Sequence, residues 1–501
     1  MRTLSKSKLL AFRQCPKRLW LEIHRPDLRQ DSSATQARFD TGNQVGDIAR
    51  RLYDTEGRGE LINPQAEGFK EAFARSLALI QSCQPIFEAG FSAAGALAFA
   101  DVLLPLQTGS GLQWRMVEVK SSTSVKDYHR DDAAIQAFVA RVAGVPLAAI
   151  ALAHIDSSWV YPGEGDYQGL LVEQDLTAEA FGRHAEVADW IAGAQAVASD
   201  VVQPAAGTGR HCREPFECGF LGHCQGQELQ PEYPVQWLPR VQSKALKSLI
   251  EIGGVKDLRD VPDVLLSERQ IRVKSHALSG ECYFDAIGAA DDLADHELPG
   301  LFLDFETIQF AVPIWPGTRP YQQIPFQFSL HVLSPTGAIE HQDFLDLSGT
   351  DPSLRFAQSL VAACSTRGPV FVYNAGFETA RIRELAERFP ALSTSLLAIN
   401  DRVVDLLTIA QQRYYHPSQQ GSWSIKKVLP AVAPDLRYDA LDGVQDGGMA
   451  MTAFLEAISP DTGVARRAEL REQLLKYCGL DTYAMVRLWQ FFAGRQDLMR
   501  Q

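Results

Sequence analysis

Acidic residues interrupt apolar stretches of this chain that otherwise have the composition of buried strands. Three such stretches occur: 96–104 with Asp101, 114–120 with Glu118, and 301–306 with Asp304 and Glu306. A carboxylate that is buried in ionised form without a partner costs several kcal/mol, or it stays protonated. These strands must therefore bring a cation to their acids, and this requirement constrains the fold more than any other feature.

The first two stretches predict a β-hairpin. The segment 108–111 is rich in glycine and separates residues 96–104 from residues 114–120. Strand alternation places Glu118 and Lys120 on the same face of the second strand. A helix over 131–143 and a strand over 148–152 follow, which is the order of a mixed α/β core.

Asp101, Glu118 and Lys120 form the first candidate site. Two carboxylates on neighbouring strands can hold a divalent cation while the lysine orients or deprotonates the attacking water. Gln136, on the following helix, is placed to contact the substrate or the nucleophile. The alternative is a surface hairpin with an ordinary ion pair.

Asp304, Glu306, Tyr477 and Asp481 form the second candidate site. The two residues on the strand share one face, and Tyr477 and Asp481 lie one helical turn apart. Together they supply the carboxylates of a two-metal centre and a hydroxyl that can hold the attacking water. Secondary structure is predicted around them as a strand at 370–373 and helices at 376–388, 466–478 and 481–494.

Length and composition predict a soluble, cytoplasmic protein of two domains. A chain of 501 residues exceeds a single hydrophobic core. No apolar run is long enough for a membrane span, and the first residues lack the pattern of a secretory signal. The net charge of −13 is unusual for a protein that binds nucleic acid, but residues 1–30 hold eight Lys/Arg against two acids.

The first 230 residues resemble the RecB-type PD-(D/E)XK nucleases that carry an iron–sulfur cluster. The resemblance rests on residues 5–18, on the first candidate site, and on the cysteines Cys15, Cys212, Cys218 and Cys224. It implies that these four thiolates bind a [4Fe–4S] cluster, which closes a long loop. The gaps in the cysteine trio are longer than usual, and His211 and His223 stand beside it, so a zinc site is the alternative. A metal-binding histidine that many relatives carry is absent from 42–47.

Residues 298–495 resemble the DEDDy branch of the RNase H-like exonucleases. Asp304, Glu306, Tyr477 and Asp481 match its motifs. Glu378 stands where the family usually has aspartate, and Asp405 is a nearby substitute. Between the motifs, residues 421–427 join an aromatic residue to two lysines, which fits either base stacking or an ordinary loop.

The three regions expected are a PD-(D/E)XK nuclease domain over 1–230, a connector with helical-hairpin character over 231–297, and an RNase H-like domain over 298–501. The combination resembles an uncharacterised bacterial family that fuses the two nuclease types. It implies a nuclease dependent on Mg²⁺ or Mn²⁺, with 3′-to-5′ exonuclease action, in DNA repair or defence against foreign DNA. RNA processing and a non-catalytic nucleic-acid scaffold are the alternatives. No Walker-type loop is present, so a helicase or a defence protein is an expected partner.

Overall fold

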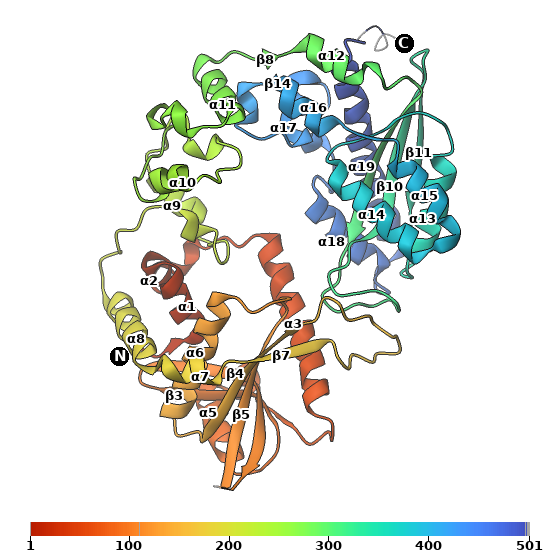
Figure 1. Ribbon diagram of the computed structural model, residues 1–501. Helices are drawn as coiled ribbons and strands as arrows, with labels where there is room; N and C mark the ends of the chain where they lie inside the picture. The colour runs from red at the N-terminus through yellow and green to blue at the C-terminus, as the bar shows by residue number, and fades with distance from the viewer. Residues whose placement is uncertain (1, 110, 496, 498–501) are drawn as a thin grey trace. The chain divides into compact units, whose positions relative to one another are not determined.

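The computed structural model describes residues 2–109, 111–495 and 497. Its contacts divide the chain into two units, which are treated separately below (Figure 1). Unit 1 contains the chain up to Leu229 together with Phe310–Tyr321. Unit 2 contains Gln230–Gln309 and the chain from Gln322 onward. Each unit combines helices with a sheet of mixed strand direction, which confirms the predicted α/β class.

Unit 1 contains, among the described residues, a seven-stranded sheet in the order β2-β3-β4-β5-β6-β7, with β1 paired to the start of β4. The strands are β1 (Leu4–Ser5), β2 (Glu60–Leu61), β3 (Ile86–Ala93), β4 (Ala96–Thr108), β5 (Gly111–Lys120), β6 (Leu147–Ile155) and β7 (Leu171–Asp175). β4 and β5 pair in antiparallel fashion, so the predicted hairpin is confirmed. β5 and β6 run parallel and are joined by a crossover helix.

Helices cover both faces of this sheet. They are α1 (Lys6–Gln14), α2 (Pro16–His24), α3 (Ser33–Tyr53), α4 (Pro64–Glu67), α5 (Phe69–Leu79), α6 (Asp127–Val142), α7 (Thr177–Gly182), α8 (His184–Ser199) and α9 (Leu221–Gln227). The crossover helix α6 packs on the face that carries Met116 and Ile150, and α3 lies against the opposite face (Figure 1). α6 ends before Gly144, whose φ of 93° suits only glycine without strain.

A segment between two strands of unit 2 belongs to unit 1. Ala311 and Val312 are buried there against Val45 and Ile48 of α3 and Ile155 of β6. We predicted that residues 298–501 form one domain, and this segment departs from that boundary. Its apolar side chains account for the difference, because they find their burial in the core of unit 1.

The sheet of unit 2 contains five strands among the described residues, in the order β11-β10-β9-β12-β13. They are β9 (Gly300–Ile308), β10 (Ile324–Leu333), β11 (Ile339–Leu345), β12 (Val370–Val372) and β13 (Val403–Asp405), and a separate pair is formed by β8 (Tyr283–Phe284) and β14 (Tyr414–Tyr415). β9 is central: it pairs antiparallel with β10 and parallel with β12. Both of its edges are therefore satisfied, and its side chains alternate between the two faces.

Helices also cover both faces of this sheet. They are α10 (Lys244–Glu251), α11 (Glu268–Ser279), α12 (Ala286–Ala294), α13 (Ser353–Ala363), α14 (Ala375–Arg388), α15 (Ser393–Asn400), α16 (Leu406–Arg413), α17 (Ile425–Val432), α18 (Gly447–Ile458) and α19 (Val464–Phe492). α13, α14 and α15 pack on the face that carries Leu301 and Leu303, whereas α18 and α19 lie on the other face (Figure 1). None of the helices in the described ranges is long and apolar enough to cross a membrane.

α19 corrects the prediction of two helices at 466–478 and 481–494. It is one helix that continues through Gly479. A glycine inside a helix costs about 1 kcal/mol. Leu474, Cys478, Thr482 and Met485 are buried at helical spacing on both sides of the glycine, and this burial outweighs that cost.

The predicted connector, 231–297, lies in unit 2. β8 pairs with β14, and Arg413 bonds to both Asp285 and Asp292. The predicted helical hairpin contains one α-helix, α10, which is followed by short 3-10 turns instead of a second α-helix. The connector is therefore packed structure of its own, with Val235, Leu246 and Leu258 in its core.

Candidate functional sites

Two carboxylates of β9 define the candidate site of unit 2. Leu303 and Phe305 point to the core under α13, so Asp304 and Glu306 point to the face covered by α19. Glu306 is only 9% exposed. Within the described part of the chain, its carboxylate has no hydrogen bond and no ion pair. A buried acid without a partner is the arrangement that an added cation relieves.

α19 brings Tyr477 and Asp481 to these acids. Both side chains are buried, and the hydroxyl of Tyr438 donates to Asp481 Oδ1 at 2.5 Å. Cys478, also on α19, completes a group with Asp304 and Glu306 in which one sulfur and two carboxylate oxygens lie within 4.8 Å of one another. Sequence reasoning missed Tyr438, which no motif marks, and Cys478, which lies next to the predicted tyrosine.

Lys426 is the cationic side chain nearest to this group. Its Nζ donates to Tyr477 Oη at 3.3 Å and to the carbonyl of Gln445 at 2.6 Å. Its Nζ also lies 5.0 Å from the ring centroid of Tyr438. Lys426 is one of the two lysines of residues 421–427, for which we predicted either base stacking or an ordinary loop, and it lies on α17. Trp423 of that loop is buried and donates to the carbonyl of Tyr414, which is a structural role.

The structure distinguishes Glu378 from its predicted substitute Asp405. Glu378 lies in the first turn of α14, is 2% exposed, and its Oε2 has no hydrogen-bond partner among the described atoms. Asp405 caps α16 by accepting from the backbone of Leu407 at 2.9 Å, and it also accepts from the backbone of Asn374 at 3.0 Å. The charge of Glu378 reaches Asp304 and helps to raise its pKa. Glu378 therefore has a buried carboxylate oxygen without a hydrogen-bond partner among the described atoms, whereas Asp405 is engaged as a helix cap.

Burial raises the pKa of every acid in this group, and repulsion from neighbouring acids of the group adds to the shift at Asp304 and Glu306. Burial, together with the charges of Asp481 and Glu306, raises the pKa of Asp304 well above its ordinary value. Burial and the charge of Asp481 raise the pKa of Glu306 to about 8, and burial chiefly raises that of Glu378 to about 8. Burial also raises the pKa of Asp481 to about 6, although the hydroxyl of Tyr438 opposes the shift. The site favours a cation or protons.

The candidate site of unit 1 forms where β4 and β5 separate. Their pairing stops at Val102 and Val117, and the carboxylate of Asp101 accepts from the backbone of Val119 at 2.6 Å. Glu118 lies on the α6 side of the sheet and is 1% exposed. Lys120 Nζ donates to Glu118 Oε1 at 2.5 Å. The hairpin thus assembles the predicted acids and lysine at one end.

α6 contributes Gln136 and an acid that sequence reasoning missed. Gln136 donates to Glu118 and, at 3.1 Å, to Asp132. Asp132 also accepts from Lys120 Nζ at 2.6 Å. Asp132 lies four residues before Gln136, so helical spacing from the predicted glutamine would have found it.

A second lysine, Lys6, enters the same site from the start of α1. Ser5 caps this helix, and β1 pairs with the start of β4, which fixes the position of Lys6. Its Nζ lies 2.8 Å from Glu118 Oε1 and 3.1 Å from Asp132 Oδ1. Lys6 lies in the segment that carries the resemblance, but no spacing rule connects it to Glu118.

The two lysines set the electrostatics of this site. Burial alone raises the pKa of Asp132, but the charges of Lys120 and Lys6 outweigh it and hold that pKa well below its ordinary range. The pKa of Asp101 is raised by burial and by the charge of Glu118. Glu88 of β3, which sequence reasoning also missed, has its pKa raised by the same two causes.

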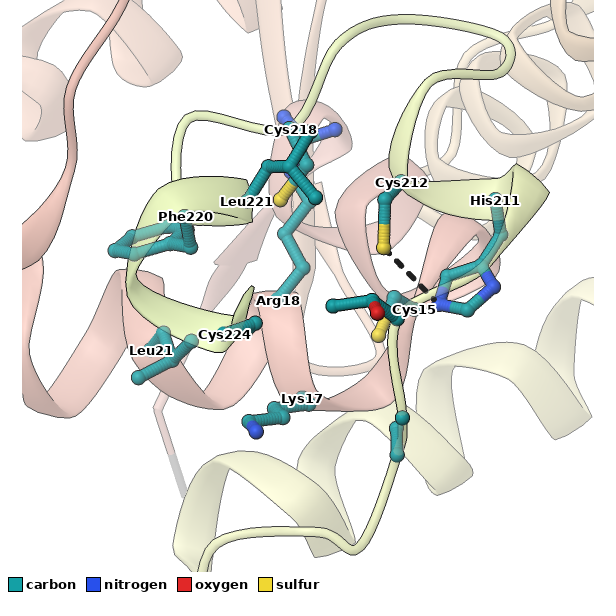
Figure 2. A pocket seen from close by; sticks show the side chains of 13 residues that line it. Cys15, Lys17, Arg18, Leu21, His211, Cys212, Cys218, Phe220, Leu221 and Cys224 are labelled. Atoms are coloured by element: carbon teal, nitrogen blue, oxygen red, sulfur yellow. Dashed lines mark hydrogen bonds between the residues drawn. The ribbon is translucent and has the colours of Figure 1, made fainter. Parts of the chain in front are cut away.

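The four predicted cysteines line one pocket in unit 1 (Figure 2). They are Cys15 between α1 and α2, Cys212 at the end of a 3-10 turn, Cys218 in a loop, and Cys224 in α9. His211 also lines the pocket, with Nε2 3.6 Å from Cys212 Sγ. Among the described residues, His223 is not part of the lining. Burial raises the pKa of the Cys212, Cys218 and Cys224 thiols.

Comparison with known families gives a match to a domain of unknown function (DUF2779) over residues 301–424. This range covers about a quarter of the chain and begins within β9. It includes Asp304, Glu306 and Glu378, but it ends before Tyr477 and Asp481. No curated protein matches the chain.

Proposed function

We propose that this protein is a divalent-metal-dependent nuclease with two hydrolytic sites, and that the site of unit 2 is a 3′-to-5′ exonuclease. The convergence of acids from β9, α14 and α19, with no lysine or arginine in ion-pair contact among the described residues, carries this proposal. Four carboxylates with little competing charge are the donor set that two hard divalent cations require. The resemblance to DEDDy exonucleases, and the RNase H-like fold it implies, agree with this donor set.

In unit 2, Asp304, Glu306, Glu378 and Asp481 would hold Mg²⁺ or Mn²⁺. The ions supply an activated water and stabilise the charge that develops on the phosphate. Tyr477 presents its hydroxyl to the attacking water, and its contact with Lys426 orients that hydroxyl. Lys426 also offers a positive charge to the substrate phosphate.

In unit 1, the proposed chemistry is that of a RecB-like PD-(D/E)XK site. Asp101 and Glu118 would hold the metal, and Lys120 would orient the water or neutralise the phosphate. Gln136 bonds both Glu118 and Asp132 and positions their carboxylates. Lys6 already contacts Glu118 and Asp132. Part of the positive charge that balances these acids therefore comes from the chain itself.

We propose a [4Fe–4S] cluster, with zinc as the alternative, for the cysteine pocket. A tetrahedral zinc site with Zn–S distances of about 2.3 Å brings its sulfurs to within ~3.8 Å of one another. Among the described residues, no three of the cysteine and histidine ligand atoms of this pocket lie within 4.8 Å of one another. Four thiolates at wider separation around one pocket suit a cluster, which would join α2 to the segment at 210–224.

DNA is the proposed substrate, with single strands or ends as its form and repair or defence as its setting. A helicase or a defence protein would supply the unwinding that a chain without a Walker loop lacks. One observation favours a second function for unit 1, a metal-independent nucleic-acid platform, because Lys6 and Lys120 already neutralise its acids.

Cleavage of 5′- and 3′-labelled DNA and RNA strands tests the proposal. With Mg²⁺ or Mn²⁺, the wild type should shorten DNA, and Asp481→Ala should abolish stepwise loss from the 3′ end. Lys120→Ala should remove a different set of products. Asp461→Ala and Lys70→Ala, at exposed positions of the same units, are the matched controls. Cleavage that persists in EDTA, or that neither site variant alters, contradicts the proposal, and preference for RNA favours the processing alternative.

A further inference from the structure

The thiol of Cys478 lies inside the acidic group of unit 2, and the proposed hydrolysis gives it no role. Cys478 is fully buried, and its Sγ lies 3.9 Å from the main-chain oxygen of Asp304. Sγ and one carboxylate oxygen each of Asp304 and Glu306 lie within 4.8 Å of one another. These atoms come from β9 and α19, two elements in extensive contact, so their proximity is built into the core.

Glu306 provides a second, independent sign of a ligand. Its side chain is nine-tenths buried, points into this group, and has no hydrogen-bond or ion-pair partner among the described residues. In a protein interior such a group calls for a partner. The thiol of Cys478 on α19 does not serve as one, since its hydrogen bond among the described residues goes to the main-chain oxygen of Asp304.

We propose that Asp304, Glu306 and Cys478 form a mixed oxygen–sulfur site for a thiophilic divalent cation such as Zn²⁺. Zinc takes cysteine sulfur and carboxylate oxygen together in tetrahedral sites, whereas Mg²⁺ requires oxygen ligands in octahedral geometry. On binding, the Cys478 thiol releases its proton to solvent, and the sulfur gains a bond to the metal.

This site makes zinc a competitor of the catalytic ions. Because Asp304 and Glu306 belong to both donor sets, Zn²⁺ and Mg²⁺ exclude each other there. This consequence rests on the proposed nuclease function, whereas the binding of the thiophilic ion does not. A rise in the free Zn²⁺ concentration of the cell would then inhibit the exonuclease of unit 2, because Cys478 helps to bind the ion.

Cobalt is the probe for the binding itself. The full-length protein is kept reduced and is titrated with Co²⁺, and the thiolate-to-cobalt charge-transfer absorption is recorded. We expect Cys478→Ser to lower this absorption by the contribution of one site. The spectrum recorded before Co²⁺ is added is subtracted, which removes the absorption of the iron–sulfur cluster proposed for the cysteine pocket of unit 1. Cys364→Ser is the matched control, because Cys364 is another buried free cysteine of unit 2, outside the acidic group.

Asp304→Asn provides the second arm. It keeps the thiol but removes one oxygen ligand, so it should weaken Co²⁺ binding at the same site by at least about tenfold. Circular dichroism of each variant checks folding. Spectra of Cys478→Ser and wild type that coincide overturn the proposal. Absorption that Cys478→Ser loses but Asp304→Asn retains also overturns it, because the thiol then acts without the carboxylates.

Zinc inhibition links the site to activity. With Mg²⁺ present, the Zn²⁺ concentration for half-inhibition should be at least about tenfold higher for Cys478→Ser than for Cys364→Ser, each relative to its own uninhibited rate. Equal zinc sensitivity of the two variants contradicts the competition. If no variant cleaves nucleic acid, the cobalt spectra still decide whether the site exists, so failure of the nuclease proposal stays distinguishable.

Discussion

The two units differ in how the negative charge of their buried acids is balanced. In unit 1, Glu118 and Asp132 are each in contact with Lys6 and Lys120. In unit 2, the acids Asp304, Glu306, Glu378 and Asp481 have no lysine or arginine in such contact among the residues that the structure describes, and each has a raised pKa. Unit 1 thus carries its own cations, whereas unit 2 leaves the place of a cation to a ligand.

This difference sets how each site depends on metal. Lysines that neutralise acids stabilise the protein without metal, but a metal ion must then displace them or share their carboxylates. Uncompensated acids destabilise the metal-free protein and bind divalent ions more strongly. Of the two, we expect unit 2 to need metal for stability as well as for catalysis.

The largest expected effect follows from removing one acid of unit 2. Asp304→Asn should lower exonuclease activity by about 10²-fold, because the metal loses a ligand worth several kcal/mol in the transition state. The same change should raise the unfolding temperature of the metal-free protein, since it relieves repulsion. Activity on a 3′-labelled strand and thermal unfolding in EDTA measure the two effects. If Asp304→Asn unfolds in EDTA at a lower temperature than the wild type, the proposed difference between the two units is wrong.

In unit 1, removing a charged side chain should lower the stability of the metal-free protein, which is the opposite of the effect expected for Asp304→Asn. Lys6→Met should destabilise the protein by about 2–3 kcal/mol, because it leaves Glu118 and Asp132 with one lysine instead of two. Urea unfolding of the metal-free protein measures the loss. Lys8→Met is the matched control. Lys8 lies on the same helix, is more exposed than Lys6, and its Nζ lies 3.7 Å from Glu22 Oε2. Equal effects of the two changes would mean that the Lys6 contacts carry no special weight.

The sequence predicted the strands and helices that carry both sites better than the contacts between residues far apart in the chain. Alternation along β9 and helical spacing along α19 correctly placed Asp304 with Glu306, and Tyr477 with Asp481, because both patterns are local. Lys6 escaped prediction because its contact with Glu118 joins residues far apart in the sequence. The burial of Ala311 and Val312 in unit 1 escaped for the same reason.

Local rules also failed where packing outweighed them. We predicted separate helices at 466–478 and 481–494, but burial on both sides of Gly479 keeps α19 continuous. Residues 231–297 were predicted to be a connector, yet the pairing of β8 with β14 and the bonds of Arg413 fix this segment within unit 2. Propensity indicates where a chain can break, and tertiary contacts decide whether it does.

A pH series sharpens the comparison further. The pKa of Glu306 is raised to about 8 in the folded state and is ordinary when unfolded, so the folded protein binds more protons between these values. The metal-free protein should therefore lose stability as pH rises from about 5 to 8, by about 3–4 kcal/mol from this group. Glu306→Gln should flatten this slope.

Metal addition is the check on that slope. Mn²⁺ should stabilise the wild type more at pH 8 than at pH 6, because at pH 6 it must displace protons from the same carboxylates. Thermal unfolding with Mn²⁺ and with EDTA, each at pH 6 and pH 8, gives the four unfolding temperatures that this comparison needs. A metal effect that is independent of pH, or one that Glu306→Gln leaves unchanged, would show that these acids are not where the metal binds.

The smallest expected effect concerns Tyr438, which donates a hydrogen bond to Asp481. This bond favours the ionised carboxylate and holds its pKa near 6 against the effect of burial. Tyr438→Phe should raise that pKa and weaken metal-dependent activity by about threefold to tenfold at pH 6, the equivalent of roughly 1 kcal/mol. At pH 8 the difference should largely disappear, because Asp481 is then ionised in both proteins. A loss that is equal at both pH values would instead assign Tyr438 to the packing of the site, and the pH profile of the variant against wild type separates the two.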